Sequence, residues 1–125
     1  MNSSIVLIIA SFFGATAIIL GAFGAHALKK HFTSDLMQSF ETGVKYQMYH
    51  ALVLLIIGFN YSQNVSLLTV AIWLFVAGTV LFSFSIYGLC LSSAFGNKMK
   101  WLGPITPLGG LCLLTGWIML GIAFV

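Results

Sequence analysis

The sequence predicts an all-α membrane protein: a single integral membrane domain over residues 1–125 with four transmembrane helices and an interfacial amphipathic helix between the first and second. Two observations carry this prediction. Of the 125 residues 60% are hydrophobic and only 6% are charged, with a mean hydropathy of +1.07, whereas a soluble domain needs a charged surface to stay in solution. The apolar residues also gather in four runs, at about 3–27, 46–61, 66–92 and 104–125.

The apolar runs are predicted to be helices rather than strands. A hydrocarbon core about 30 Å thick requires roughly 20 helical residues, and backbone polar groups inside it must be bonded within the protein. Neither IVLIIASFFGATAIIL nor LLTVAIWLFVAGTVLF alternates apolar with polar residues, as a membrane β-strand would. Three runs are long enough to span, and the run over 46–61 can borrow length from the helical segment before it.

That preceding segment, residues 33–45, has the pattern of an amphipathic helix. Asp35 and Gln38 have capping-box spacing at its start. On a 100° wheel its apolar residues share one face and its polar residues lie opposite, which is typical of a helix at the membrane interface. The helix is expected either to bend near Gly43 or to run straight into the second span.

The last span begins in the sequence LGPITPLGG. Proline is tolerated in the first turn of a helix because its missing N–H has no intrahelical partner there. Either Pro104 or Pro107 can take that position, and Thr106 is a good N-cap before the second proline.

The five basic residues are all lysines, and they predict the orientation of the chain. They lie in two connections that a four-span topology puts on one side of the membrane: Lys29, Lys30 and Lys45 in the first, Lys98 and Lys100 in the second. The positive-inside rule makes that side cytoplasmic. Both termini are then expected to face the exterior or the periplasm.

Charge and cysteine content argue against a nucleic-acid-binding protein and against a fold held together by disulfides or zinc. The net charge of +3 does not indicate a nucleic-acid partner, because the lysines are few and scattered among apolar runs. Cys90 and Cys112 form no C-x-x-C motif and lie in apolar runs, so they are expected to be small packing residues. Membrane lipids are therefore the expected partners.

Small residues form stripes on three of the predicted helices, and such stripes let membrane helices approach closely. The glycines of these stripes are Gly14, Gly21 and Gly24 in the first span, Gly78 in the third, and Gly109 and Gly116 in the fourth. Two stripes could hold the monomer together, and the third could serve a homo-oligomer or a larger membrane complex.

Polar residues at membrane depth are candidates for function. His26 ends the first span and His50 lies one turn into the second, so antiparallel helices are expected to bring them to similar depth on the cytoplasmic side. The candidate cluster is His26, Tyr46, Gln47, His50, Ser85 and Tyr87, with Glu41 and Thr106 as accessory residues. It can be a hydrogen-bonded interior that fixes helix register, a ligand or lipid-headgroup site, or a cofactor site in which His26 and His50 hold haem, a metal ion or a quinone.

No catalytic constellation is visible in the sequence. There is no membrane-embedded carboxylate pair, and no serine lies in a nucleophile motif. We therefore expect a non-enzymatic protein without a cofactor or metal, with a structural or accessory role through helix packing and lipid contacts. The alternative is a cofactor-binding protein; an oligomeric small-solute transporter is weaker, because the sequence shows no internal inverted repeat.

Four stretches, GAFGAHALK, FETGVKYQMYHALVLL, VLFSFSIYGL and LGPITPLGGLCLLTGW, occur in this order over nearly the whole chain. Together they resemble the YgdD-like family of small bacterial inner-membrane proteins, a domain-of-unknown-function family with relatives in eukaryotes. The resemblance implies four membrane helices, placement in the cytoplasmic membrane, no established catalytic activity and, in some members, a suggested role in membrane integrity. The residues that match the family pattern are Gly21, Gly24, His26, Thr42, Gly43, Tyr46, Gln47, His50, Ser83, Ser85, Tyr87, Gly103, Thr106, Pro107, Gly109, Gly110, Gly116 and Trp117. Phe84 departs from it by standing where glycine is usual.

Overall fold

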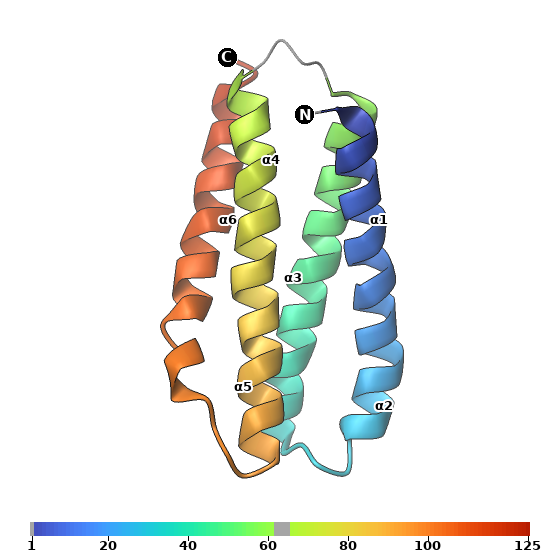
Figure 1. Ribbon diagram of the computed structural model, residues 1–125, viewed down its shortest axis with the longest axis vertical. Helices are drawn as coiled ribbons and strands as arrows, with labels where there is room; N and C mark the ends of the chain where they lie inside the picture. The colour runs from blue at the N-terminus through green and yellow to red at the C-terminus, as the bar shows by residue number, and fades with distance from the viewer. Residues whose placement is uncertain (1, 62–65) are drawn as a thin grey trace.

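The computed structural model describes residues 2–61 and 66–125, and over those residues it contains helices and no strand. The chain forms an antiparallel, up-and-down bundle (Figure 1). Its elements are α1 (Ser3–Ile19), a π-helical turn (Leu20–Gly24), α2 (Ala25–Leu28), α3 (Ser34–Phe59), α4 (Ser66–Thr79), a second π-helical turn (Val80–Phe84), α5 (Ser85–Ala94), a 3-10 turn (Lys100–Leu102) and α6 (Ile105–Ile122). The expected lysine-free connection between the second and third spans falls largely on residues 62–65, outside the described residues.

Polar side chains set the first turns of two helices. The Asn2 side chain accepts a hydrogen bond from the Ser4 N–H at 2.6 Å at the start of α1. The Thr33 hydroxyl accepts one from the Leu36 N–H at 3.3 Å at the start of α3. Such side-chain acceptors satisfy N–H groups that have no intrahelical partner. Asp35, which the sequence suggested as the cap, lies inside the first turn of α3.

The structure does not support a separate interfacial helix over residues 33–45. α3 is one helix of 26 residues that passes through this segment without a break. The apolar face of the segment packs into the bundle instead: Phe40 is 1% exposed, and a Cβ at Gly43 would lie only 2.8 Å from the Tyr87 ring. The segment is therefore the first part of a long helix that also contains the second predicted span, and it is buried against α5.

Three helical stretches, Ser3–Leu28, Ser66–Ala94 and Lys100–Ile122, are long and apolar enough to cross a membrane. α3 runs alongside them for the same length of the bundle (Figure 1). Large apolar side chains such as Phe12 and Ile56 are exposed on the outer surface. An apolar outer surface suits acyl chains as the surrounding solvent, whereas soluble monomers rarely expose extended apolar patches.

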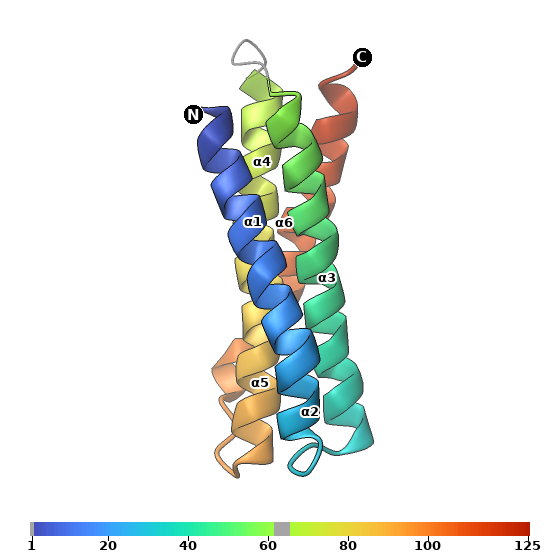
Figure 2. The same ribbon diagram turned by 90° about the vertical axis from the view of Figure 1, so that its right-hand side faces the viewer.

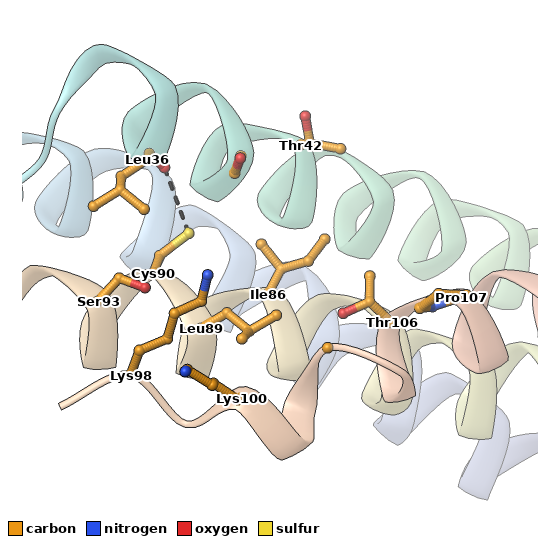
Figure 3. Close-up of a pocket in the computed structure, with 12 residues that line it drawn as sticks. Leu36, Thr42, Ile86, Leu89, Cys90, Ser93, Lys98, Lys100, Thr106 and Pro107 are labelled. Carbon is orange, nitrogen blue, oxygen red and sulfur yellow. Dashed lines mark hydrogen bonds between the residues drawn. The ribbon is translucent and has the colours of Figure 1, made fainter.

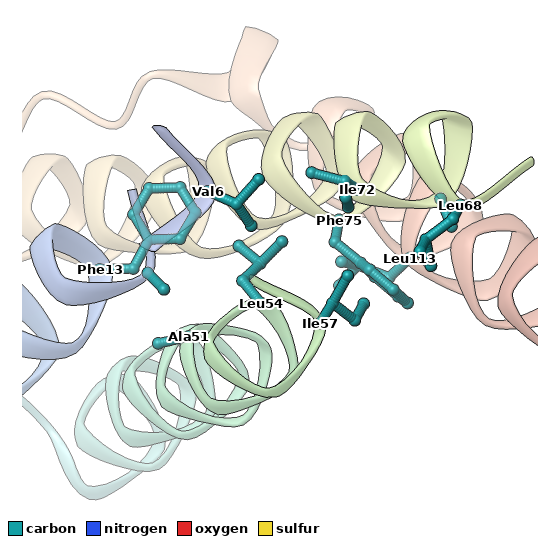
Figure 4. Close-up of a cluster of buried hydrophobic side chains, with 11 residues drawn as sticks. Val6, Phe13, Ala51, Leu54, Ile57, Leu68, Ile72, Phe75 and Leu113 are labelled. Carbon is teal, nitrogen blue, oxygen red and sulfur yellow. The ribbon is translucent and has the colours of Figure 1, made fainter. Parts of the chain in front are cut away.

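The helices pack in pairs. α1 packs mainly on α3, α4 packs mainly on α6, and α3 also contacts α4 and α5 (Figure 2). Both chain ends lie at one end of the bundle, opposite the connections that follow α2 and α5 (Figure 1). The larger buried cluster fills the half nearer the chain ends (Figure 4); it consists of Val6, Ala10, Phe13, Ala51, Leu54, Ile57, Leu68, Ala71, Ile72, Phe75 and Leu113.

Glycines set the spacing between α1 and α3. A Cβ added at Gly21 would lie 3.2 Å from the Val44 side chain, and one at Gly24 would lie 3.0 Å from the Phe40 ring. Gly14 also faces α3, at ordinary contact distance. All three glycines predicted on the first helix therefore serve packing within this chain.

The pair formed by α4 and α6 is tighter still. A Cβ at Gly78 would lie 2.7 Å from the Leu113 side chain. One at Gly109 would lie 2.8 Å from the Phe82 Cα and would also collide with its backbone nitrogen. Gly116 faces the same helix pair. Since the predicted glycines of both pairs face helices of their own chain, the stripes give no argument for an oligomer.

Candidate functional site

Gln47 is fully buried and links three helices. Its Nε2 donates to the Phe13 carbonyl at 2.9 Å and to the Thr16 hydroxyl at 2.7 Å, both on α1. Its Oε1 accepts from the Tyr87 hydroxyl on α5 at 2.7 Å. A side-chain amide has two N–H donors, and both are engaged here, so Gln47 has no donor left for a ligand.

Two serines attach the second π-helical turn and α5 to their neighbours. Ser83 Oγ donates to the Gly43 carbonyl of α3 at 2.7 Å. Ser85 Oγ donates to the Phe82 carbonyl at 2.9 Å and lies 2.6 Å from the Thr106 hydroxyl of α6. Because the single Ser85 proton goes to the carbonyl, Thr106 is the donor of the second bond. The two serines thus fix the positions of α3 and α6 along the bundle axis relative to α5.

His50 is buried in the middle of the bundle and has a partner on each ring nitrogen. Nδ1 lies 2.7 Å from the Tyr46 carbonyl, which can only accept, so Nδ1 carries the proton. Nε2 then accepts from the Trp117 indole N–H at 3.2 Å. The imidazole is held as a neutral tautomer, and its acceptor nitrogen is not free to bind haem or a metal ion.

The structure separates His26 from His50, contrary to the predicted pairing. Gly24 lies against Phe40, which precedes His50 by ten residues on α3, about 15 Å at 1.5 Å per residue. His26 lies beyond Gly24 toward the connection and is exposed. The prediction began the second span at residue 46, one turn before His50, whereas α3 begins at Ser34 and is one continuous helix, so His50 is far from its end.

Other predicted site residues also lie outside the buried cluster. Tyr46 is 41% exposed; its carbonyl accepts the bond from His50, and its ring stacks on the His50 ring with centroids 6.3 Å apart. Glu41 is exposed on α3. Lys45 was predicted in a connection, but it lies on α3, eleven residues after the start of that helix. Phe84, the departure from the family pattern, is 36% exposed, and its ring packs edge-on against Tyr87 with centroids 5.7 Å apart.

Three polar side chains of the interior were missed by the sequence reasoning. Thr16 carries no sequence signal, because a helical threonine commonly bonds the carbonyl one turn earlier, and it does so here at 2.7 Å as well. Trp117 is 49% exposed, but its indole N–H points to His50; its signal was the indole N–H itself, which in an apolar span needs an acceptor. The buried Thr79 hydroxyl has no hydrogen-bond partner within the described part of the chain.

The hydrogen bonds of the cluster hold helices together. The residues that the structure describes contain no group of three or more His, Cys, Asp or Glu that could hold a metal ion. The bonds of Tyr87 and Ser83 reach α3, the bond of Ser85 reaches Thr106 on α6, and His50 on α3 bonds to Trp117 on α6.

The chain is similar to a family of membrane proteins of unknown function. A family model described as "Protein of unknown function (DUF423)" matches residues 20–110. The UPF0382 membrane protein YwdK of Bacillus subtilis is 42% identical over 111 residues, covering 87% of this chain and 86% of that one. The UPF0382 membrane protein C1782.12c of Schizosaccharomyces pombe is 37% identical over 110 residues, with coverage of 87% and 92%. The UPF0382 inner membrane protein YgdD of Escherichia coli is 36% identical over 121 residues, with coverage of 96% and 88%. No solved structure matches the chain.

Proposed function

Because the chain belongs to the DUF423 family of membrane proteins, we propose from its geometry that it is a four-span inner-membrane protein with a structural or accessory role. In this role it supports the membrane barrier through helix packing and lipid contacts rather than through catalysis. One observation carries this proposal. The buried polar side chains Gln47, Tyr87 and His50 bond within the bundle, while the outer surface is apolar.

The geometry of α3 supports counting it as the fourth span. Its 26 residues measure about 39 Å at 1.5 Å per residue, more than a hydrocarbon core of about 30 Å. Its polar residues Gln47 and His50 are buried and hydrogen-bonded. Paired in this way, they do not oppose insertion as unpaired groups in lipid would. The exposed Lys45 can extend its long side chain toward the membrane surface.

The lysines support a cytoplasmic location for the end of the bundle opposite the chain termini. Lys29, Lys30, Lys98 and Lys100 lie in or next to the connections at that end (Figure 1), and lysine-rich connections stay in the cytoplasm. To test this orientation, single cysteines at Asn60 and Lys98 are introduced in a chain without native cysteines. In sealed cells an impermeant thiol reagent is expected to label position 60 and to reach position 98 only after permeabilisation. The reverse pattern would overturn the orientation.

Barrier function is tested by genetic deletion. Cells without the protein are expected to take up a membrane-impermeant dye faster than the parent, and the wild-type chain restores the barrier. Gly109→Ala, which disrupts the contact of α6 with the second π-helical turn, should restore it poorly, whereas Gly121→Ala should restore it fully because an added Cβ meets nothing within 4 Å there. Unchanged dye uptake in the deletion strain would refute the proposed role.

The cofactor alternative is tested on the same purified protein. His50 has both ring nitrogens engaged and His26 lies at the end of the bundle, so we expect no Soret band and no stoichiometric metal. A band or metal content that disappears in His50→Ala would contradict the structural role.

A further inference from the structure

A pocket of about 680 Å³ lies at the lysine-bearing end of the bundle (Figure 3). It is bounded by the first half of α3, by α5 and by the segment that leads into α6. Its volume falls within the range of small-molecule sites, about 300–1,000 Å³. The sequence reasoning missed it, because Lys98 and Lys100 were interpreted only as a topology signal.

The lining of the pocket is divided between apolar and cationic groups. Leu36, Ile86 and Leu89 form an apolar wall, and Lys98 and Lys100 lie on the side of the connecting segment (Figure 3). Hydroxyl groups complete the lining, from Ser39, Thr42, Ser93 and Thr106. None of the lining residues is acidic. The pocket is therefore complementary to a molecule with an anionic head and an apolar chain.

The segment that carries the two lysines is held in place. α5 ends at Ala94 and is followed by Gly96, which lies in the left-handed region at φ +83°. The Asn97 N–H donates to the Ser92 carbonyl at 3.0 Å, as in a Schellman motif. The Ser92 hydroxyl then accepts from the Met99 N–H at 3.1 Å. Close approach at Gly88 fixes the following turn, since a Cβ there would lie 2.6 Å from the Leu102 side chain. A site built on fixed backbone loses less entropy on binding.

We propose that this pocket binds the phosphate headgroup of an anionic phospholipid. Lys98 and Lys100 face the phosphate charge, Ser39 and Ser93 are hydroxyl donors for its oxygens, and Leu89 lies in the apolar wall along the first part of an acyl chain. A free phosphate ion would gain nothing from the apolar wall, which favours the lipid over a soluble anion. The inference rests on the proposed placement of this end at the cytoplasmic membrane surface, where anionic lipids attract basic groups.

The test measures lipid binding to the purified full chain in zwitterionic detergent micelles. Phosphatidylglycerol and phosphatidylcholine are titrated separately, and bound lipid is counted by native mass spectrometry. Wild type is expected to retain phosphatidylglycerol preferentially. Lys98→Gln/Lys100→Gln should weaken that binding roughly 30-fold, about fivefold for each lysine. The matched control is Lys29→Gln/Lys30→Gln, which removes the same charge at the same end outside the pocket, and its affinity should stay within about twofold of wild type.

Three outcomes would overturn the proposal. Equal weakening in both lysine pairs would mean general surface attraction rather than a site. Displacement of the lipid by millimolar inorganic phosphate would mean that the ligand is a soluble anion. Unchanged affinity in Leu89→Trp, which keeps both lysines and fills the apolar wall, would mean that no acyl chain enters the pocket. The dye-uptake assay is independent of lipid binding: a barrier restored by wild type, together with any of these three outcomes, would leave the proposed function standing without this site.

Discussion

Gln47→Leu is the most informative substitution in the interior, because it removes every side-chain bond of the residue that joins α1, α3 and α5. Leucine has a similar size, so the change tests hydrogen bonding more than volume. Thr16 keeps its bond to the Phe12 carbonyl. The buried Tyr87 hydroxyl, by contrast, loses the acceptor it has at 2.7 Å.

The expected cost follows from that difference. Hydrogen bonds between membrane helices contribute on average about 0.6 kcal/mol and at most about 1.7 kcal/mol, and an orphaned buried hydroxyl costs about 1–3 kcal/mol. Gln47→Leu should therefore lower the free energy of unfolding by about 1–3 kcal/mol. Tyr87→Phe should lower it by about 1 kcal/mol. The double variant should cost about 1 kcal/mol less than the sum of the two, since each single change already breaks the shared bond.

Unfolding of the purified protein by sodium dodecyl sulfate in mixed micelles, followed by circular dichroism, measures these differences. Gln38→Leu is the matched control, because Gln38 is an exposed glutamine on the same helix, and it should change stability by less than about 0.5 kcal/mol. Equal effects of Gln47→Leu and Gln38→Leu, together with additive effects of Gln47→Leu and Tyr87→Phe, would refute the claim that this network fixes helix register.

Two further substitutions test other contacts. Gly109→Ala should destabilise the protein by about 1–3 kcal/mol, because its Cβ would collide with the Phe82 backbone; the same unfolding assay should show Gly121→Ala to be neutral or slightly stabilising, and equal effects would contradict the packing argument. Trp117→Phe should cost about 1 kcal/mol, because it leaves the acceptor nitrogen of His50 unpaired. The double variant of His50→Ala and Trp117→Phe should cost less than the sum of the two single changes, since both break the shared bond, and fully additive effects would argue otherwise.

The sequence was sufficient for the all-α membrane architecture, because hydropathy and run length leave few ways to satisfy a backbone in lipid. The family resemblance is confirmed by the match to residues 20–110 and by the relative YgdD. The interfacial helix was not found, because an amphipathic pattern specifies a buried face and a polar face without saying what covers the first. In this chain Tyr87 and its neighbours on α5 cover it.

The candidate site was harder to derive, because a single sequence does not show how far one helix is shifted along its neighbour. A register error of twelve residues placed His50 beside His26, whereas the bundle puts it beside Trp117. Gln47 and Tyr87 were grouped correctly as buried polar residues. Their bond to one another depends on both the start of α3 and the π-helical turn before α5, and the π-helical turn has no clear sequence signal.

The register of the bundle is more demanding than its apolar packing suggests. Lipid chains are as apolar as leucine, so sliding one helix along another by a turn changes little hydrophobic energy. Such a slide would break the bonds of Gln47 and Ser83 and would move Gly109 away from the Phe82 backbone. Interior polar groups and glycines therefore specify one arrangement of α1, α3, α4 and α6. With those groups engaged inside, contacts with other molecules fall to the apolar outer surface and the lysine-bearing pocket.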